Sequence, residues 1–81
     1  MEAFRLMRLL KEQAKINAKL FDQIKHNEEP DAKLDRRGNV IAREVLSALP
    51  ASRKEEFEVL LFTTRTDEEM KDLVRKIIPL L

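Results

Sequence analysis

Few side chains in this sequence have the type and spacing that catalysis or metal binding requires. The 81 residues include no cysteine and one histidine, His26, so a single chain lacks the thiolates or paired imidazoles of a zinc site. Glu28 and Glu29 are adjacent in sequence, which does not by itself place two carboxylates on either side of a bond to be cleaved. His26 is expected near the end of a helix, where a cation interacts favourably with the helix dipole. We therefore expect a protein that is not an enzyme and that uses no metal or cofactor.

A regular row of basic residues is the next candidate for chemistry. Its members recur at steps of three and four residues and share one side of a predicted helix: Arg8, Lys11, Lys15 and Lys19. Together with Arg36 and Arg37, this basic stripe could contact the phosphates of a nucleic acid. However, 16 basic side chains are nearly balanced by 15 acidic ones, whereas nonspecific nucleic-acid binding needs an uncompensated basic field. A solvated helix surface is the simpler interpretation, and phosphate binding is the alternative.

An apolar seam interrupted by amides lies on the opposite side of the same predicted helix. At about 100° per residue its members fall together: Leu6, Leu9, Leu10, Gln13, Ile16, Asn17, Leu20 and Ile24. Aliphatic residues with a few amides among them are typical of a helix that packs on a specific partner helix. In coiled coils a buried amide fixes the register or the number of strands. Gln13 and Asn17 either act in this way or lie at the edge of the seam and reach water.

A second candidate surface is predicted on a shorter helix near residue 60. Phe57, Leu60 and Leu61 form one apolar side, whereas Val59 and Phe62 point elsewhere. One layer of helices cannot bury both sets. Val59 and Phe62 are therefore either covered by another helix or exposed as a patch that recruits a partner.

The elements that must hold these side chains are predicted to be helices throughout. The chain has one glycine, no tryptophan or tyrosine, and none of the alternation typical of strands, so the fold class is all-α. A long N-terminal amphipathic helix is expected over about 2–26, followed by Pro30, which favours a break. A compact unit of three short helices is expected after it, at about 40–49, 53–64 and 67–78. The chain thus divides into an association helix, a polar linker and a three-helix unit, together one small domain, at 1–29, 30–38 and 39–81.

Local signals predict the limits and inward sides of the short helices. Ser52 with Glu55, and Thr66 with Glu69, have the spacing of capping boxes, in which side chains bond the free N–H groups at a helix start. The inward positions of the second and fourth helices follow from the 3.6-residue period: Ile41, Val45, Leu49, Met70, Leu73, Val74 and Ile77. Gly38 is expected to close the linker.

The length of the first helix favours an interaction function. A helix of about 25 residues spans about 38 Å, whereas helices of about 10 to 13 residues span about 15–20 Å, so part of the seam stays exposed in a monomer. A chain this small also has a marginal core and often gains stability by oligomerisation. We expect a non-enzymatic protein–protein interaction module, first of all a homo-oligomerisation or scaffold domain that dimerises through the seam, and otherwise an adaptor for a different protein. The alternative is a nucleic-acid-associated accessory domain.

Targeting signals are not visible in the sequence. No apolar run approaches the roughly 20 residues of a membrane span, and the first residues lack the pattern of a signal peptide. We therefore expect a soluble intracellular protein, in the cytoplasm or the nucleus.

Overall fold

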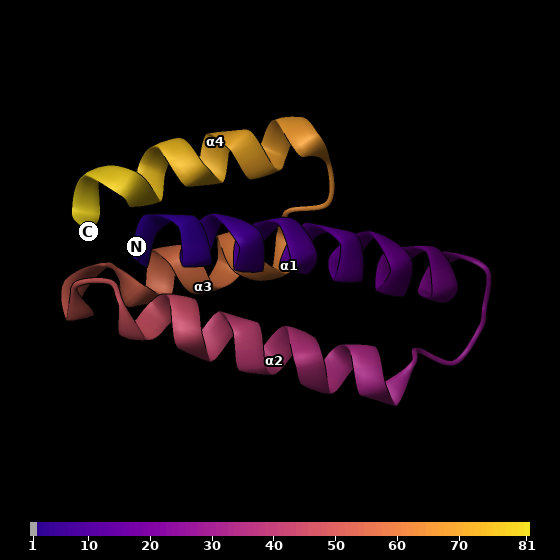
Figure 1. Ribbon diagram of the computed structural model, residues 1–81. Coiled ribbons are helices and arrows are strands. Elements are labelled where there is room, and N and C mark those ends of the chain that lie inside the picture. The colour runs from indigo at the N-terminus through magenta and orange to yellow at the C-terminus, as the bar shows by residue number, and fades with distance from the viewer. Residues whose placement is uncertain (1) are drawn as a thin grey trace.

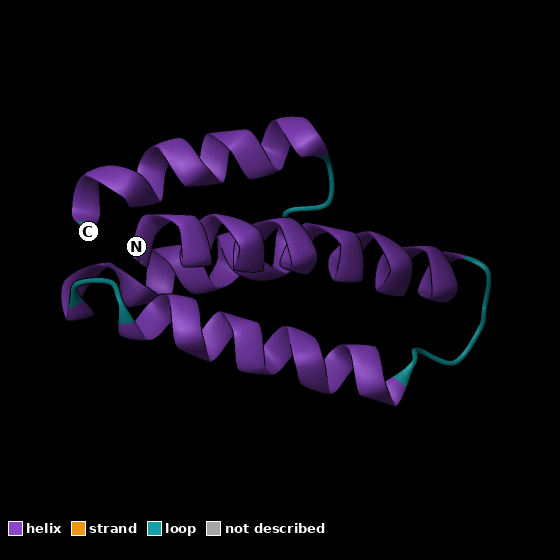
Figure 2. Ribbon diagram, viewed as in Figure 1, coloured by secondary structure: helices purple, strands orange, loops and turns teal. Residues whose placement is uncertain are grey.

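Helices account for all the regular secondary structure in residues 2–81, the part of the chain that the structure describes. In this computed structural model four α-helices follow one another, with two short 3-10 turns (Figure 1, Figure 2). Their bounds are α1 (Glu2–Lys25), α2 (Ala32–Ser47), η1 (Ala51–Arg53), α3 (Lys54–Thr63), α4 (Asp67–Ile77) and η2 (Ile78–Leu80). The predicted all-α class, with a long first helix and shorter helices after it, is confirmed.

Consecutive helices run in opposite directions, as is usual when short loops join them (Figure 1). α1 contacts each of the other three helices, and α2 also packs on α3. α3 and α4 lie beside the N-terminal part of α1, whereas the C-terminal turns of α1 extend past them beside the start of α2 (Figure 1). The molecule is therefore longer than it is wide, at 38 × 22 × 22 Å.

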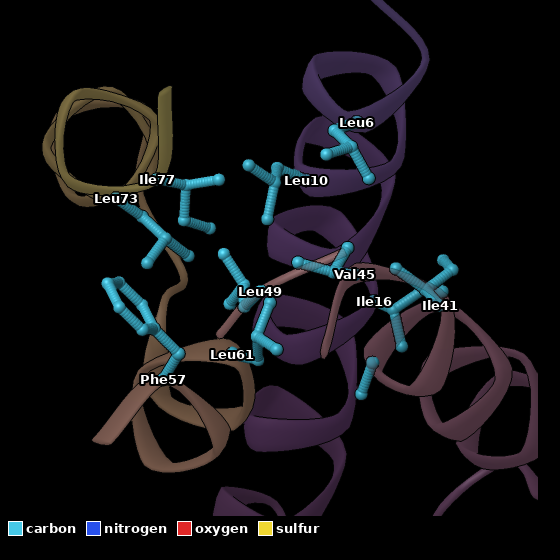
Figure 3. Packing of buried hydrophobic residues seen from close by; sticks show 11 residues of the cluster. Leu6, Leu10, Ile16, Ile41, Val45, Leu49, Phe57, Leu61, Leu73 and Ile77 are labelled. Carbon is cyan, nitrogen blue, oxygen red and sulfur yellow. The ribbon is translucent and has the colours of Figure 1, made fainter. Parts of the chain in front are cut away.

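The hydrophobic core lies where α1 meets the other helices (Figure 3). Its buried side chains are at most 6% exposed: Leu6, Leu10, Ile16, Ile41, Ala42, Val45, Leu49, Phe57, Leu61, Leu73 and Ile77. Figure 3 shows Ile77 of α4 and Leu10 of α1 pointing toward each other. The predicted inward positions are confirmed, with Met70 and Val74 partly rather than fully buried.

α1 ends in a Schellman motif, in which two N–H groups bond back to carbonyls of the last helical turn. Asn27 has a left-handed backbone, with φ 58°, and its N–H donates to the Ile24 carbonyl at 3.1 Å. The N–H of Glu28 donates to the Gln23 carbonyl at 2.8 Å. Because asparagine tolerates this conformation better than most residues, the helix stops here, one residue before the predicted limit.

α2 begins at Ala32, well before its predicted start near 40, so most of the segment 30–38 is helix rather than linker. The cause is an N-cap that the helix prediction missed. Asp31 Oδ1 accepts hydrogen bonds from the N–H groups of Lys33 and Leu34, at 2.9 and 3.3 Å. The Leu34 side chain is partly buried against the core, so the added turns contribute packing as well as hydrogen bonds.

Gly38 lies in the middle of α2 and is buried, instead of closing a linker. A Cβ atom at this position would lie 3.4 Å from Ile16 Cγ2 and 3.5 Å from Gln13 Oε1, both on α1. Both distances are those of ordinary van der Waals contact, so α2 packs against α1 at Gly38 and the position has room for a Cβ atom. This tertiary contact outweighs the weak helix propensity of glycine, which is why the sequence pattern was misleading here.

The two predicted capping boxes have different outcomes. At α4 the box is present, because Thr66 Oγ1 accepts from the Glu69 N–H at 3.1 Å and Glu69 Oε1 accepts from the Thr66 N–H at 3.2 Å. At α3 the prediction is wrong: Ser52 is the middle residue of η1, and no side-chain hydrogen bond caps η1 or α3. An N-cap residue has an extended backbone, whereas Ser52 is already helical. Arg53 and Glu56 instead form an ion pair at 2.9 Å across the first turn.

Candidate functional site

Most of the predicted seam is buried inside the chain. Five of its residues are at most 7% exposed: Leu6, Leu10, Gln13, Ile16 and Asn17. Leu9 and Leu20 are partly buried at the edge of the core. Ile24 is 61% exposed, although it lies on the same side of α1 as the buried Asn17 two turns earlier. The first two thirds of the seam therefore pack on the chain's own helices, and the last part is open to solvent.

The open end of the seam follows from the helix lengths. α1, with 24 residues, spans about 36 Å, while α3 and α4, with 10 and 11 residues, span about 15–17 Å. Both shorter helices lie beside the N-terminal part of α1, so the seam continues past the end of α3 and the start of α4 (Figure 1).

The two amides of the seam hold the C-terminal end of α3. Asn17 Nδ2 donates to the carbonyls of Leu61 and Thr64, at 2.7 and 2.8 Å. Gln13 Nε2 donates to the same Leu61 carbonyl at 3.1 Å. The last carbonyls of a helix have no partner within that helix, so these amides satisfy groups that would otherwise be buried without one. The interpretation of Gln13 and Asn17 as water-exposed edge residues is wrong, and in this structure they fix the position of α1 against α3 within one chain.

A groove lies at the open end of the seam, and we call it the end groove. It is bordered by α1, by the end of α3 and by the loop that follows: Asn17, Leu20, Phe21, Ile24, Phe62, Thr63 and Arg65. Its exposed large apolar side chains are Phe21, Ile24 and Phe62, at 50%, 61% and 43% exposed. The volume is about 390 Å³, near the low end for ligand pockets. That is room for a few apolar side chains.

Arg65 gives the end groove its charge. Its guanidinium carbon lies 3.7 Å from the centroid of the Phe21 ring, in a cation–π contact. The backbone N–H of Arg65 donates to Glu69 Oε1 at 3.3 Å. This hydrogen bond, followed by one from the Thr66 hydroxyl, holds the pKa of the Glu69 carboxyl below its ordinary value. The loop that carries Arg65 is therefore fixed by the cap of α4 on one side and by Asn17 on the other.

The chemistry available in the end groove is apolar contact together with one guanidinium group. Residues 2–81 contain no cluster of three or more histidine, cysteine, aspartate or glutamate side chains that could hold a metal ion. Over the same residues, no helix is long and apolar enough to cross a membrane. The exposed side chains of Phe21, Ile24 and Phe62 suit the groove to binding an apolar surface.

The second predicted surface meets the first at Phe62. Val59 is 63% exposed and Phe62 43% exposed, so another helix of the chain does not cover them. Phe62 lines the end groove together with Ile24, whereas Val59 lies one turn earlier on the outer side of α3. The structure therefore joins two candidate surfaces that are far apart in the sequence.

Phe21, Thr63 and Arg65 are the residues of the end groove that the sequence analysis missed. Phe21 precedes Ile24 by three residues, so its place on the flank of the seam could have been found from helical spacing. Arg65 lies in the loop between α3 and α4, where no periodic pattern marks a side chain.

The predicted basic stripe is exposed along its whole length, at Arg8, Lys11, Lys15 and Lys19. Glu12, the acidic residue within it, is paired with Arg37, whose Nε and Nη2 donate to its two carboxylate oxygens at 2.6 and 3.1 Å. These hydrogen bonds hold the pKa of the Glu12 carboxyl below its ordinary value.

The linker arginines have different positions from those predicted. Arg36 and Arg37 both lie on α2, because the segment assigned to a linker is helical. Arg36 is exposed and remains accessible, whereas Arg37 is engaged by Glu12. Arg36 is therefore the more accessible of the two for a phosphate.

Comparison with models of known protein families, with characterised proteins and with solved structures finds no match to this chain.

Proposed function

We propose that this protein is a non-enzymatic protein–protein interaction module that self-associates through the end groove. The observation that carries the proposal is the exposure of Phe21, Ile24 and Phe62 around one groove, while the rest of the seam is buried. Three large apolar side chains gathered at one place are a feature of interaction surfaces, whereas single exposed ones need no explanation.

The groove lies where the layer formed by α3 and α4 ends. α1 continues beyond these two helices (Figure 1), and the exposed Ile24 there lies on the side of α1 that they cover nearer the N-terminus. A helix from another chain that lies over this end of the seam would bury Ile24 and Phe21 as the intrachain helices bury Leu10. Each copy presents the exposed end of its own seam, so two copies can cover each other's exposed apolar side chains.

The expected affinity is modest. A half-exposed phenylalanine leaves about 100 Å² of apolar surface, so Phe21, Ile24 and Phe62 leave about 300 Å² per copy. A dimer that buries both patches would gain about 15 kcal/mol at 25 cal/mol per Å², and association costs roughly 4–15 kcal/mol. With an association cost near the middle of that range, about 9 kcal/mol, the net gain is about 6 kcal/mol, which corresponds to a dissociation constant of tens of micromolar. The association must therefore be measured at high protein concentration.

Sedimentation velocity between about 5 µM and 1 mM tests the proposal. The wild-type mass should rise with concentration, and Ile24→Glu should remain a monomer, because a charge would have to be buried without a partner. Lys15→Glu, on the opposite side of α1, is the matched control and should associate like the wild type. A wild-type protein that stays monomeric over the whole range refutes the proposal, and so does an Ile24→Glu variant that associates normally.

The basic stripe supports a second candidate function, binding to the phosphates of a nucleic acid. The specific observation is that Glu12 is neutralised by Arg37, so four exposed cations follow one another without an unpaired acid among them. Fluorescence anisotropy with a DNA duplex of about 20 base pairs distinguishes the candidates. Phosphate binding should weaken steeply as salt rises and should be reduced by Lys15→Glu but not by Ile24→Glu, the reverse of the pattern expected for the groove.

A further inference from the structure

The outer side of α3 carries charges of opposite sign at its two ends. Glu55 and Val59, four residues apart, and Phe62, three further on, lie on one exposed side of the helix. Glu58 lies next to Phe62 on this side, and Arg65 follows the C-terminal end. The order along the helix is therefore acidic, apolar and basic.

We propose that the occupant of the end groove is a second copy of this chain, with the two α3 helices antiparallel across a two-fold axis and Glu55 of each copy facing Arg65 of the other. This inference rests on the proposed function and specifies its partner and geometry. A surface that is acidic at one end and basic at the other is complementary to itself when it is turned by 180°, as an isologous interface requires.

The register follows from the apolar pair. In two antiparallel helices, a step toward the C-terminus on one helix corresponds to a step toward the N-terminus on the other. When Val59 lies against Phe62 of the second copy, Glu55, four residues earlier, lies just beyond the C-terminal end of the second copy's α3, which stops at Thr63. Glu55 is then about 8 Å along the axis from the centre of the pair, beside the loop in which Arg65 follows two residues after that end.

The charges also exclude the parallel arrangement. A two-fold axis parallel to α3 would place Glu55 against Glu55 and Glu58 against Glu58, so like charges would face each other.

Among the described residues, no ion pair in the structure engages Glu55. The Arg65 guanidinium carbon lies 3.7 Å from the centroid of the Phe21 ring at the edge of the groove, so its charge and the apolar ring are presented together. Val59 of the second copy is then the apolar side chain that meets Phe62 at the groove.

Charge reversal tests the register. Glu55→Arg and Arg65→Glu should each raise the dissociation constant of the homodimer at least about tenfold at low salt, because each places two like-charge contacts in the interface. An equimolar mixture of the two variants should recover the wild-type mass, since both contacts of the mixed dimer then join an arginine of one copy to a glutamate of the other. Glu29→Arg, in the loop between α1 and α2, and Lys15→Glu are the matched controls and should dimerise normally. Circular dichroism confirms that each variant is folded.

Each result has a definite meaning. If both single variants dimerise like the wild type, or if their mixture stays monomeric, the antiparallel α3 register is wrong, although association through the end groove stands as long as Ile24→Glu still abolishes it. If the wild type is a monomer at every concentration, the proposed function fails and this inference fails with it. Recovery of the dimer in the mixture supports the inference, because a different partner protein could not produce it.

Discussion

Replacement of Asn17 by leucine should destabilise the protein more than any other substitution of a polar residue on α1. Leucine has nearly the same size and suits the buried, apolar surroundings of a side chain that is 7% exposed. The substitution nevertheless removes two hydrogen bonds to carbonyls at the end of α3, at 2.7 and 2.8 Å. The loss of stability comes from the carbonyls that remain buried. Leaving one buried polar group without a hydrogen-bond partner costs far more than removing both partners of the bond.

The magnitude follows from which carbonyls lose a partner. The Leu61 carbonyl keeps the bond from Gln13 Nε2 at 3.1 Å, whereas the Thr64 carbonyl loses the side-chain donor that Asn17 supplied. One buried carbonyl without a partner costs about 1–3 kcal/mol, and the weakened second one adds to it, so we expect a loss of about 2–3 kcal/mol. In a domain of about 80 residues this lowers the melting temperature by about 10–20 °C.

Gln13→Leu is the matched comparison and should cost clearly less. Its Nε2 bond is to a carbonyl that Asn17 also serves, and its Oε1 is buried without any hydrogen-bond partner. Removing Gln13 therefore also removes a buried acceptor that has no partner, and the two effects offset each other.

The assay is urea unfolding followed by circular dichroism, at a protein concentration low enough to keep the chain monomeric, because association would add stability of its own. Asn17→Leu should shift the midpoint to lower urea without changing the slope, and Gln13→Leu should shift it less. If Asn17→Leu is as stable as the wild type, or if Gln13→Leu is the more damaging of the two, the amides do not hold α3 in the way described.

Three further predictions concern stability. Gly38→Ala should raise the free energy of unfolding by about 0.5–1 kcal/mol, because the new Cβ meets Ile16 at an ordinary contact distance of 3.4 Å while helix propensity improves. Thermal melting measures this change. A loss of stability would mean that α1 and α2 pack more tightly than described. Thr66→Ala should cost about 1 kcal/mol through its cap, and Ser52→Ala less than about 0.5 kcal/mol, in parallel urea titrations; equal losses would contradict the assignment of the caps. The lowered pKa of Glu12 contributes stability that is fully present above the ordinary pKa of a glutamate and is lost as the pH falls through the lowered value. Glu12→Gln should therefore reduce the loss of stability between about pH 6 and pH 3. Urea unfolding at each pH measures this loss.

Local patterns of the sequence predicted the helices that local interactions determine. The period of the apolar residues defined α1, and the spacing of Thr66 and Glu69 located the start of α4. The start of α2 was missed because Gly38 and its charged neighbours resemble a linker, although Asp31 supplies a cap and α1 a packing partner. The capping box predicted at Ser52 is wrong for the opposite reason. The sequence pattern matches, but the 3-10 turn η1 begins at Ala51, so Ser52 is already helical and cannot act as an N-cap.

The candidate site was predictable in part. The seam period correctly placed Ile24 on the core side of α1, and the apolar pattern of α3 singled out Phe62. A period identifies one side of a helix but not what covers it, so the burial of Leu10 and the exposure of Ile24 could not be told apart from sequence. The partners of Asn17 are main-chain carbonyls, which every residue possesses and which no sequence pattern distinguishes.

The central position of α1 has a consequence for synthesis on the ribosome. Leu6 and Leu10 are made well before α3 and before Ile77 of α4, on which they pack. Until α4 has left the exit tunnel, α1 and α2 can pair, but much of the seam has nothing to pack on. A nascent chain therefore exposes the apolar seam of a long amphipathic helix while α3 and α4 are still being made, which is the condition under which chains bind chaperones or aggregate. The apolar residues that stabilise the finished protein are also the part of the chain that must be shielded for longest.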